Sequence, residues 1–431
     1  MRVARVLMML AACAQSLGAQ APVVTVIKAA RLIVGNGTQV ESPVVVITGD
    51  RITAVGTAAQ VRVPNGAKVI DLAGGTIMPG FFDMHTHITS IDNDGGDLSV
   101  LKETAAHGAI YAVINAKKTL EAGFTTVREA GSTDYVDVTV RDAINRGLIP
   151  GPRIHASGPS LGSTGGHADV NGWSPNLMIP GTGAIVDGPD AIRHQVRLNV
   201  KYGADQIKFV ATGGILSVGD AVNAPQYGDD EMKALVDEAT RLGRKVMAHA
   251  HGGAGLLAAV NAGASSIEHG SLVDDAAITA MKSCGTYLVP TLIILEEIVT
   301  DGVRKGVPAN SIAKATAIAA ERRVRLRKAY QSGVKFALGT DATSDIHGRN
   351  GEEFKYMVDI LGATPMDAIT VGTMNAATLL GVDQDFGSVA VGKVADIVAV
   401  GGNPLIDISL LARVSFVMKG GVVVKSAAAP R

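Results

Sequence analysis

The chain lacks several features that mark whole classes of protein. Its 431 residues include two cysteines, Cys13 and Cys284, which excludes a disulfide framework. The net charge is −1 and only 18% of the residues are charged, so there is no basic field to hold nucleic acid or an anionic membrane surface. We find no internal repeats or low-complexity tracts, which a structural or interaction protein would need.

Long apolar runs are also missing, and the one at the N-terminus is short. Two arginines precede the apolar run Val6–Ala12, which is too short to span a bilayer and is typical of a signal peptide. We therefore predict a signal peptide over residues 1–21 and an exported protein, periplasmic or secreted. Cleavage after Ala19 is one interpretation. The alternative is lipidation at Cys13, which would give an outer-membrane lipoprotein.

Short β-rich runs separated by turns occur at both ends of the chain. Val44–Ile47 is an example near the start and Val422–Lys425 is one near the end. Such short hairpins cannot bury a core alone. We therefore expect the two ends to meet in one small β-sandwich domain made of residues 22–79 and 385–431.

Strands and helices alternate between these ends, over residues 80–384. Eight βα units in a row favour an α/β fold with a closed (β/α)8 TIM-like barrel, in which chemistry occurs where the strands run into the following loops. The predicted strands are Gly80–His87, Thr125–Ala130, Arg153–Gly158, Gln206–Ala211, Lys245–His249, Ser266–His269, Thr286–Thr291 and Lys335–Asp341.

Two histidines end the first predicted barrel strand. His85 and His87 are two residues apart, so in a strand both imidazoles point to the same face and can reach one metal ion. A lone His-x-His is common by chance. The preceding Met78-Pro79-Gly80 and the position on the first strand favour the metal site.

Lys208 lies inside an apolar run, Ile207 to Val210. A buried ammonium is costly, and burial shifts lysine towards its neutral amine. The neutral amine can add carbon dioxide and become a carbamate that bridges two cations. The ordinary alternative is a lysine that extends to solvent at a strand end.

Further candidate ligands follow other predicted strands. His249 and His251 form a second His-x-His, and His269 and Asp341 end later strands. Any one histidine is ordinarily a buried side chain bonded to backbone, but a carboxylate at the end of an apolar strand needs a cation. All of these residues fall at carboxyl ends of strands, which scattered histidines would not do.

The residues around these candidates form motifs spread over nearly the whole chain after the leader. The motifs are Met78–His87, Asp205–Lys208, His249–Gly252, Ile267–Gly270, Gly339–Asp341 and Gly387–Val398. As a set they resemble the amidohydrolase superfamily, and within it the imidazolonepropionase-related metallo-dipeptidase branch. That branch includes Xaa-Pro and Xaa-Arg dipeptidases and ochratoxin-hydrolysing amidohydrolases.

The resemblance implies a binuclear metal centre. It implies that His85, His87 and Asp341 hold one divalent ion, that His249 and His269 hold the other, and that N6-carboxylated Lys208 bridges them. Nitrogen and oxygen ligands suit Zn²⁺, with Co²⁺ or Mn²⁺ as alternatives. A metal-bridging hydroxide would then cleave an amide next to a C-terminal carboxylate, in a dipeptide or N-acyl amino acid.

The resemblance also implies residues that handle the substrate. Asp341 would move the proton, and Tyr227 and His251 would hold the substrate carboxylate or carbonyl. His167 and His347, on loops, are further candidates, as is Arg128 at the end of the second strand. The ordinary alternatives are loop packing for the histidines and tyrosine and an ion pair for the arginine.

Two rival functions follow from the same sequence. One is cyclic amide hydrolysis of the imidazolonepropionase type, which usually proceeds with one metal and no bridging lysine. The other is a non-catalytic metal-binding barrel, which predicts a broken ligand set, whereas all six positions are filled. We expect a homo-oligomer, with an octamer as one arrangement. The sequence does not fix the substrate side chain, the native metal or the oligomeric state.

Overall fold

The computed structural model describes residues 23–90, 102–177, 179, 181–343 and 345–426. The predicted signal peptide, with Cys13 and Ala19, lies outside the described residues. Within the described residues, no helix combines the length and the apolar character that a bilayer crossing requires.

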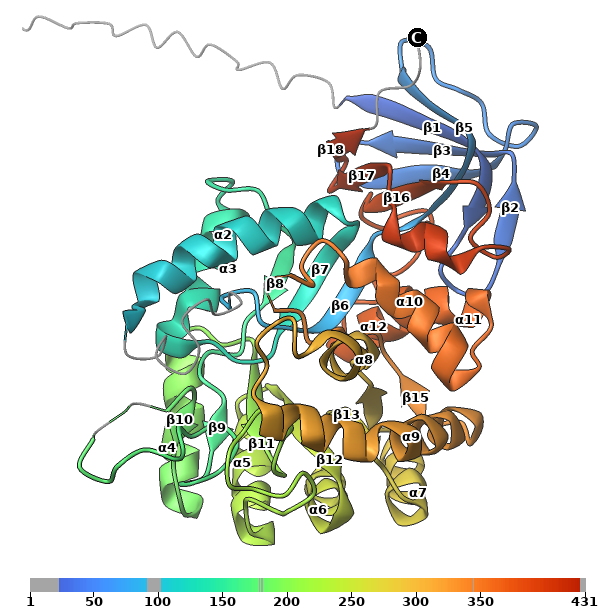
Figure 1. The fold of residues 1–431 in the computed structure, drawn as a ribbon. Helices are drawn as coiled ribbons and strands as arrows, with labels where there is room; N and C mark the ends of the chain where they lie inside the picture. Colours follow the sequence, from blue (N-terminus) through green and yellow to red (C-terminus); the bar gives the residue numbers. More distant parts are fainter. Residues whose placement is uncertain (1–22, 91–101, 178, 180, 344, 427–431) are drawn as a thin grey trace, which may run out of the picture.

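Strands from both ends of the chain pair in one eight-stranded sheet, drawn in blue and red in Figure 1. The two ends join where β5 pairs antiparallel with β16, with Ile77 opposite Ala399. The predicted meeting of the termini is therefore observed, while the sandwich form and the domain boundaries stay predictions. The strands are β1 (Val24–Ile33), β2 (Gln39–Glu41), β3 (Pro43–Thr48), β4 (Arg51–Thr57), β5 (Lys68–Pro79), β16 (Ile397–Gly401), β17 (Phe416–Lys419) and β18 (Val422–Ser426).

Alternate residues of β3 pack on the two faces of this terminal sheet. Val45 and Ile47 contribute to one buried cluster, and Val44 and Val46 contribute to another. This follows from the two-residue period of a strand, which sends successive side chains to opposite faces. The sheet is thus stabilised by apolar burial on both faces of β3.

All eight strands predicted between the termini are present, and their pairing is parallel. They form a three-stranded sheet, β6-β7-β8, and a seven-stranded sheet that also contains two short extra strands, β9 and β10. The strands are β6 (Phe81–Thr86), β7 (Phe124–Glu129), β8 (Arg153–His155), β9 (Leu161–Gly162), β10 (Ala184–Ile185), β11 (Gln206–Val210), β12 (Lys245–Gly252), β13 (Ser266–Leu272), β14 (Tyr287–Val289) and β15 (Lys335–Phe336).

Helices follow most of these strands and lie outside them, as Figure 1 shows for α4 to α7. This alternation is typical of parallel sheets, whose crossovers are helices. The helices are α2 (Ala105–Glu121), α3 (Val136–Asn145), α4 (Pro189–Lys201), α5 (Asp229–Arg241), α6 (Gly253–Ala262), α7 (Asp275–Cys284), α8 (Leu292–Asp301), α9 (Ala309–Gln331), α10 (Glu353–Tyr356), α11 (Pro365–Thr370) and α12 (Ala376–Leu380). Short 3-10 or π turns are η2 (Thr133–Tyr135), η3 (Asn350–Glu352), η4 (Met357–Leu361), η5 (Val371–Asn375) and η6 (Ile408–Ala412).

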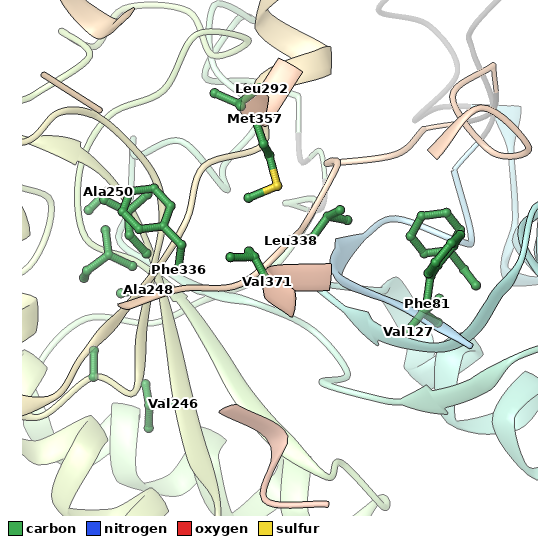
Figure 2. Packing of buried hydrophobic residues seen from close by; sticks show 14 of the residues in the cluster. Phe81, Val127, Val246, Ala248, Ala250, Leu292, Phe336, Leu338, Met357 and Val371 are labelled. Carbon is green, nitrogen blue, oxygen red and sulfur yellow. The ribbon is translucent and has the colours of Figure 1, made fainter. Parts of the chain in front are cut away.

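Backbone hydrogen bonds connect the two parallel sheets at two places, one between β6 and the segment after β15 and one between the segments next to β8 and β11. The Asp341 N–H donates to the His85 carbonyl at 2.8 Å, and the Asp205 N–H donates to the Ala156 carbonyl at 2.8 Å. Apolar side chains from both sheets, such as Phe81 and Phe336, share one large core (Figure 2). The carboxyl ends of β6 and of the segment after β15 are therefore neighbours.

Candidate metal centre

Three predicted ligands meet at the junction of the two parallel sheets. His85 and His87 lie at the end of β6, and Asp341 follows β15. Asp341 Oδ1 lies 3.4 Å from His85 Nε2 and 3.2 Å from His87 Nε2. One ligand atom from each residue lies within 4.8 Å of the others, an arrangement that fits a metal ion.

The other three predicted ligands line the same cavity. Lys208 comes from β11, His249 from β12 and His269 from β13, and all three border a cavity of about 590 Å³ together with the first group. The ring centre of His269 lies 5.0 Å from that of His85 and 4.6 Å from that of His249. The six side chains predicted as ligands therefore converge in one place.

Burial sets the protonation of Lys208. Its side chain is 3% exposed, and burial lowers the pKa of its ammonium from 10.5 to about 8. A meaningful share of neutral amine is then present near neutral pH, and that form reacts with carbon dioxide. The burial of Lys208 expected from its apolar run is observed, while carboxylation stays a prediction.

Burial also lowers the pKa of the imidazoles of His87, His249 and His269. Neutral imidazole is the form that coordinates a metal. His269 Nδ1 is bonded to Thr291 Oγ1 at 2.7 Å, which leaves its Nε2 for another partner. His249 Nε2 lies 3.3 Å from the Gly213 carbonyl.

Asp341 is held as a carboxylate by its histidine neighbours. Burial acts to raise the pKa of this carboxyl group, but the His85 charge and the hydrogen bonds from His85 and His87 hold it well below its ordinary value. An ionised carboxylate beside imidazole nitrogens is a donor set suited to a divalent cation.

A buried ion pair supports His85 from behind. Glu268 Oε2 lies 2.8 Å from His85 Nδ1, and Glu268 Oε1 accepts a 2.8 Å hydrogen bond from Arg128. Arg128 also donates to Ser266 Oγ and to the Met84 carbonyl. A carboxylate on one ring nitrogen orients a histidine so that the other nitrogen faces the metal.

Glu268 lies in one of the sequence motifs but was not among the residues predicted to have a role. The signal was available, because a carboxylate inside an apolar parallel strand is costly unless it is paired. Asp83 is a second such carboxylate, and it accepts hydrogen bonds from the His85 N–H and from Thr340 and Asn350. These bonds connect β6 to the segment that carries Asp341.

Strained backbone is concentrated around the cavity. Among the described residues, six that are not glycine have positive φ, and four of these line the cavity: Asp134, His269, Thr291 and Asp341. Such a backbone conformation costs of order 1–3 kcal/mol per residue and persists where the surrounding structure enforces it, typically at functional sites. Two of the four are predicted metal ligands.

Two of the predicted substrate-binding residues reach the cavity. His251 lines it and has its Nδ1 2.9 Å from Ser271 Oγ, and burial lowers its pKa to about 3. His167 also lines it, with its ring centre 4.4 Å from that of His249. His167 Nδ1 is buried and has no hydrogen-bond partner among the described residues.

Three others are not part of the cavity lining. The Tyr227 hydroxyl donates to the Val186 carbonyl at 3.0 Å, so it is engaged within the fold. His347 contacts Thr119 Oγ1 and the His87 carbonyl, and Arg128 is in the buried ion pair with Glu268. For Arg128 the ion-pair interpretation is the observed one, although the pair is buried rather than exposed. His347 contacts the backbone of the predicted ligand His87, and Arg128 contacts Glu268, which is the partner of His85. Neither side chain faces the cavity.

The model of the amidohydrolase family matches residues 76–425. Ochratoxinase from Aspergillus niger is 33% identical over 427 residues, covering 93% of this chain and 87% of the relative.

Solved structures give the same picture. A Xaa-Pro dipeptidase with methionine bound in its active site superposes with a TM-score of 0.88 at 38% identity, covering 94% of this chain and all of that one. A prolidase complexed with N-methylphosphonate-L-proline has a TM-score of 0.86 at 36% identity with the same coverage. The resemblance inferred from the motifs is confirmed: the chain belongs to the amidohydrolase family and is a hydrolase of amide bonds.

Proposed function

We propose that this protein hydrolyses the amide bond next to a free carboxylate, in dipeptides or N-acyl amino acids, ochratoxin-like amides included. The convergence of six potential ligand side chains on one cavity is the observation that carries this proposal. The relatives named above support the substrate class, since they include an ochratoxinase, a Xaa-Pro dipeptidase and a prolidase. A cavity of about 590 Å³ is large enough for a small organic ligand.

The donor set suits two divalent cations, for which Zn²⁺ is our choice. His85, His87 and Asp341 would hold one, His249 and His269 the other, and N6-carboxylated Lys208 would bridge them. When bound, the cations would polarise the scissile carbonyl and make water more acidic. Their positive charge would also favour a substrate with a carboxylate end.

The residues of the chain would then handle protons and orientation. As water adds to the amide carbon, an Asp341 oxygen accepts its proton and later delivers it to the nitrogen of the leaving amine as the C–N bond breaks. The His251 ring, oriented through Nδ1 by Ser271, offers its other nitrogen to the carbonyl oxygen. His167, with an unpartnered ring nitrogen, is our next candidate for contact with the substrate.

The remaining predictions complete the proposal. The parallel strands would close into a (β/α)8 barrel over residues 80–384, with the terminal sheet forming the β-sandwich. Export to the periplasm or medium would suit the use of external peptides or the breakdown of amides. A homo-oligomer is part of the same proposal, to be checked by light scattering.

A hydrolysis screen tests the function. Purified protein loaded with zinc would be offered dipeptides, N-acyl amino acids and a cyclic amide, and released amino acid would be measured. We expect amino acid release from one or more of the first two groups. Ring opening of the cyclic amide alone, followed as loss of that compound, would favour the imidazolonepropionase type, and hydrolysis of no compound would contradict the proposal.

A further inference from the structure

One wall of the cavity is apolar. Ile215 and Leu216 from the loop after β11, and Ile294, Leu295 and Ile298 from α8, line the same space as the predicted ligands. We call these five residues the apolar wall. The rest of the lining includes polar residues such as Glu103, Thr104 and Asp134.

The three residues from α8 form one face of that helix. Ile294 and Ile298 are four residues apart, and Leu295 is three residues before Ile298, a spacing that places all three side by side. Leu295 and Ile298 are each 5% exposed, and they pack with Ile215 in one buried cluster. The loop and the helix therefore form a single continuous surface.

The helix that carries this surface is fixed at its first turn. The buried Glu353 carboxyl group accepts hydrogen bonds from the N–H groups of Leu292 and Ile293, at 2.7 and 2.8 Å. Arg322, itself 1% exposed, donates to the carbonyls of Thr291 and Leu292. The Glu353 carboxyl group satisfies N–H groups that a helix start leaves without intrahelical partners, and Arg322 holds the carbonyls of the same turn in place.

The loop is fixed by a lysine from the neighbouring helix α9. Lys314 Nζ donates to the carbonyls of Gly214 and Ser217 and to Asp220 Oδ1, each at 2.9 Å. These three bonds flank Ile215 and Leu216 on both sides in sequence. The apolar wall is therefore preformed, and a ligand that binds it does not pay to order it.

The apolar wall offers no partner to a cationic side chain. Asp220, the acidic residue of its loop, is paired with Lys314. On α8, Glu296 is paired with Arg322 and Arg323, and Glu297 with Lys305. A lysine or arginine side chain placed there would lose water without gaining a counter-charge, which is unfavourable.

We propose that the apolar wall determines specificity, by binding an apolar aliphatic or aromatic side chain of the substrate on one side of the scissile amide and excluding basic ones. The inference rests on the proposed amide hydrolysis and names its substrate class. In a hydrophobic pocket of this kind, one methylene more or less on the substrate changes kcat/KM by roughly 10–200-fold.

Two substrate series test the proposal with the metal-loaded full-length enzyme. In Gly-Xaa dipeptides the varied residue leaves, and in Xaa-Gly dipeptides it carries the scissile carbonyl; Xaa is leucine, phenylalanine, lysine or arginine. We expect kcat/KM for leucine and phenylalanine to exceed that for lysine and arginine at least about tenfold in one series. That series identifies which side of the amide the wall contacts. Equal rates in both series would overturn the proposal.

Leu216→Glu tests the wall itself. Leu216 is 52% exposed, so a charge is tolerated there, and we expect the apolar preference in the responding series to fall about tenfold or more. Val218→Glu is the matched control, because Val218 is 49% exposed on the same loop and does not line the cavity. An unchanged preference in Leu216→Glu, or an equal loss in both variants, would contradict the assignment.

Failure of the proposed function is separable from failure of this inference. If the wild-type enzyme cleaves neither these dipeptides nor any dipeptide or N-acyl amino acid of the hydrolysis screen, amide hydrolysis next to a carboxylate is contradicted. Calorimetric binding of the leucine, phenylalanine, lysine and arginine dipeptides then decides whether the apolar wall selects apolar side chains. Tighter binding of leucine and phenylalanine dipeptides, lost in Leu216→Glu, would support the apolar wall. Equal binding of lysine and arginine dipeptides would overturn it.

Discussion

The terminal sheet and the cavity end of the parallel strands bury different kinds of side chain. In the terminal sheet the buried side chains are mostly apolar, such as Ile27 and Val45, and ion pairs such as that between Arg31 and Glu41 are partly exposed. At the cavity end the strands bury charged or titratable groups, among them Lys208 and Glu268. Burying such groups costs free energy unless they are paired. The terminal sheet therefore contributes mainly stability, whereas the groups suited to chemistry are concentrated at the cavity end.

The sharpest test of this contrast is the variant Lys208→Ala. We expect it to abolish binding of the metal pair and to lower kcat/KM at least about a thousandfold, because several kcal/mol of charge stabilisation in the transition state are lost. Metal content by mass spectrometry and the rate of amide hydrolysis would be measured together. Lys282→Ala, at an exposed position of α7, is the control. Two metals retained per chain in Lys208→Ala would contradict the carbamate bridge.

The converse test is Ile27→Ala in the terminal sheet. Ile27 is fully buried, so we expect the free energy of unfolding to fall by about 2–5 kcal/mol, with kcat/KM unchanged under conditions where the protein stays folded. Urea denaturation gives the first quantity and steady-state kinetics the second. A loss of activity in the folded variant would show that the two regions are coupled.

Glu268→Gln tests the support behind the predicted ligands. Removing the carboxylate charge that orients His85 should weaken metal binding by about 10–100-fold, as measured by competition with a chelator. Glu238→Gln is a matched control, because Glu238 is bonded to Arg197 and Arg241 and does not line the cavity. Equal metal affinity in the two variants would mean that Glu268 has only a structural role.

The smallest expected effect is a pH dependence of stability from Lys419, at the end of β17 in the terminal sheet. Lys419 donates to the Gly151 carbonyl, and burial lowers the pKa of its ammonium from 10.5 to about 8. The unfolded chain therefore binds more protons than the folded one between these values, so the contribution of Lys419 to stability rises with pH from 8 to 10.5. Lys419→Met should flatten this slope in urea denaturation curves, whereas Lys282→Met should not.

Sequence patterns predicted the strands well, because a strand is encoded by residue types and spacings that lie close together along the chain. Apolar runs bounded by turn residues located all eight parallel strands, and the two-residue period placed His85 and His87 on one face. The sequence did not reveal that Tyr227 is bonded to Val186 or that Arg128 pairs with Glu268. Those contacts join different elements, and no periodicity along the chain encodes them.

The sequence by itself determined the family, the order of strands and helices, and the six candidate ligands, because each is a matter of residue type and short spacing. Only the tertiary structure decided that Asp341 Oδ1 lies 3.2 Å from His87 Nε2 and that Glu268 is hydrogen-bonded to His85. It also decided that α8 lines the cavity with an apolar face. The physical reason is that contacts between residues distant in the chain are set by how whole elements pack, and packing is a property of the complete fold.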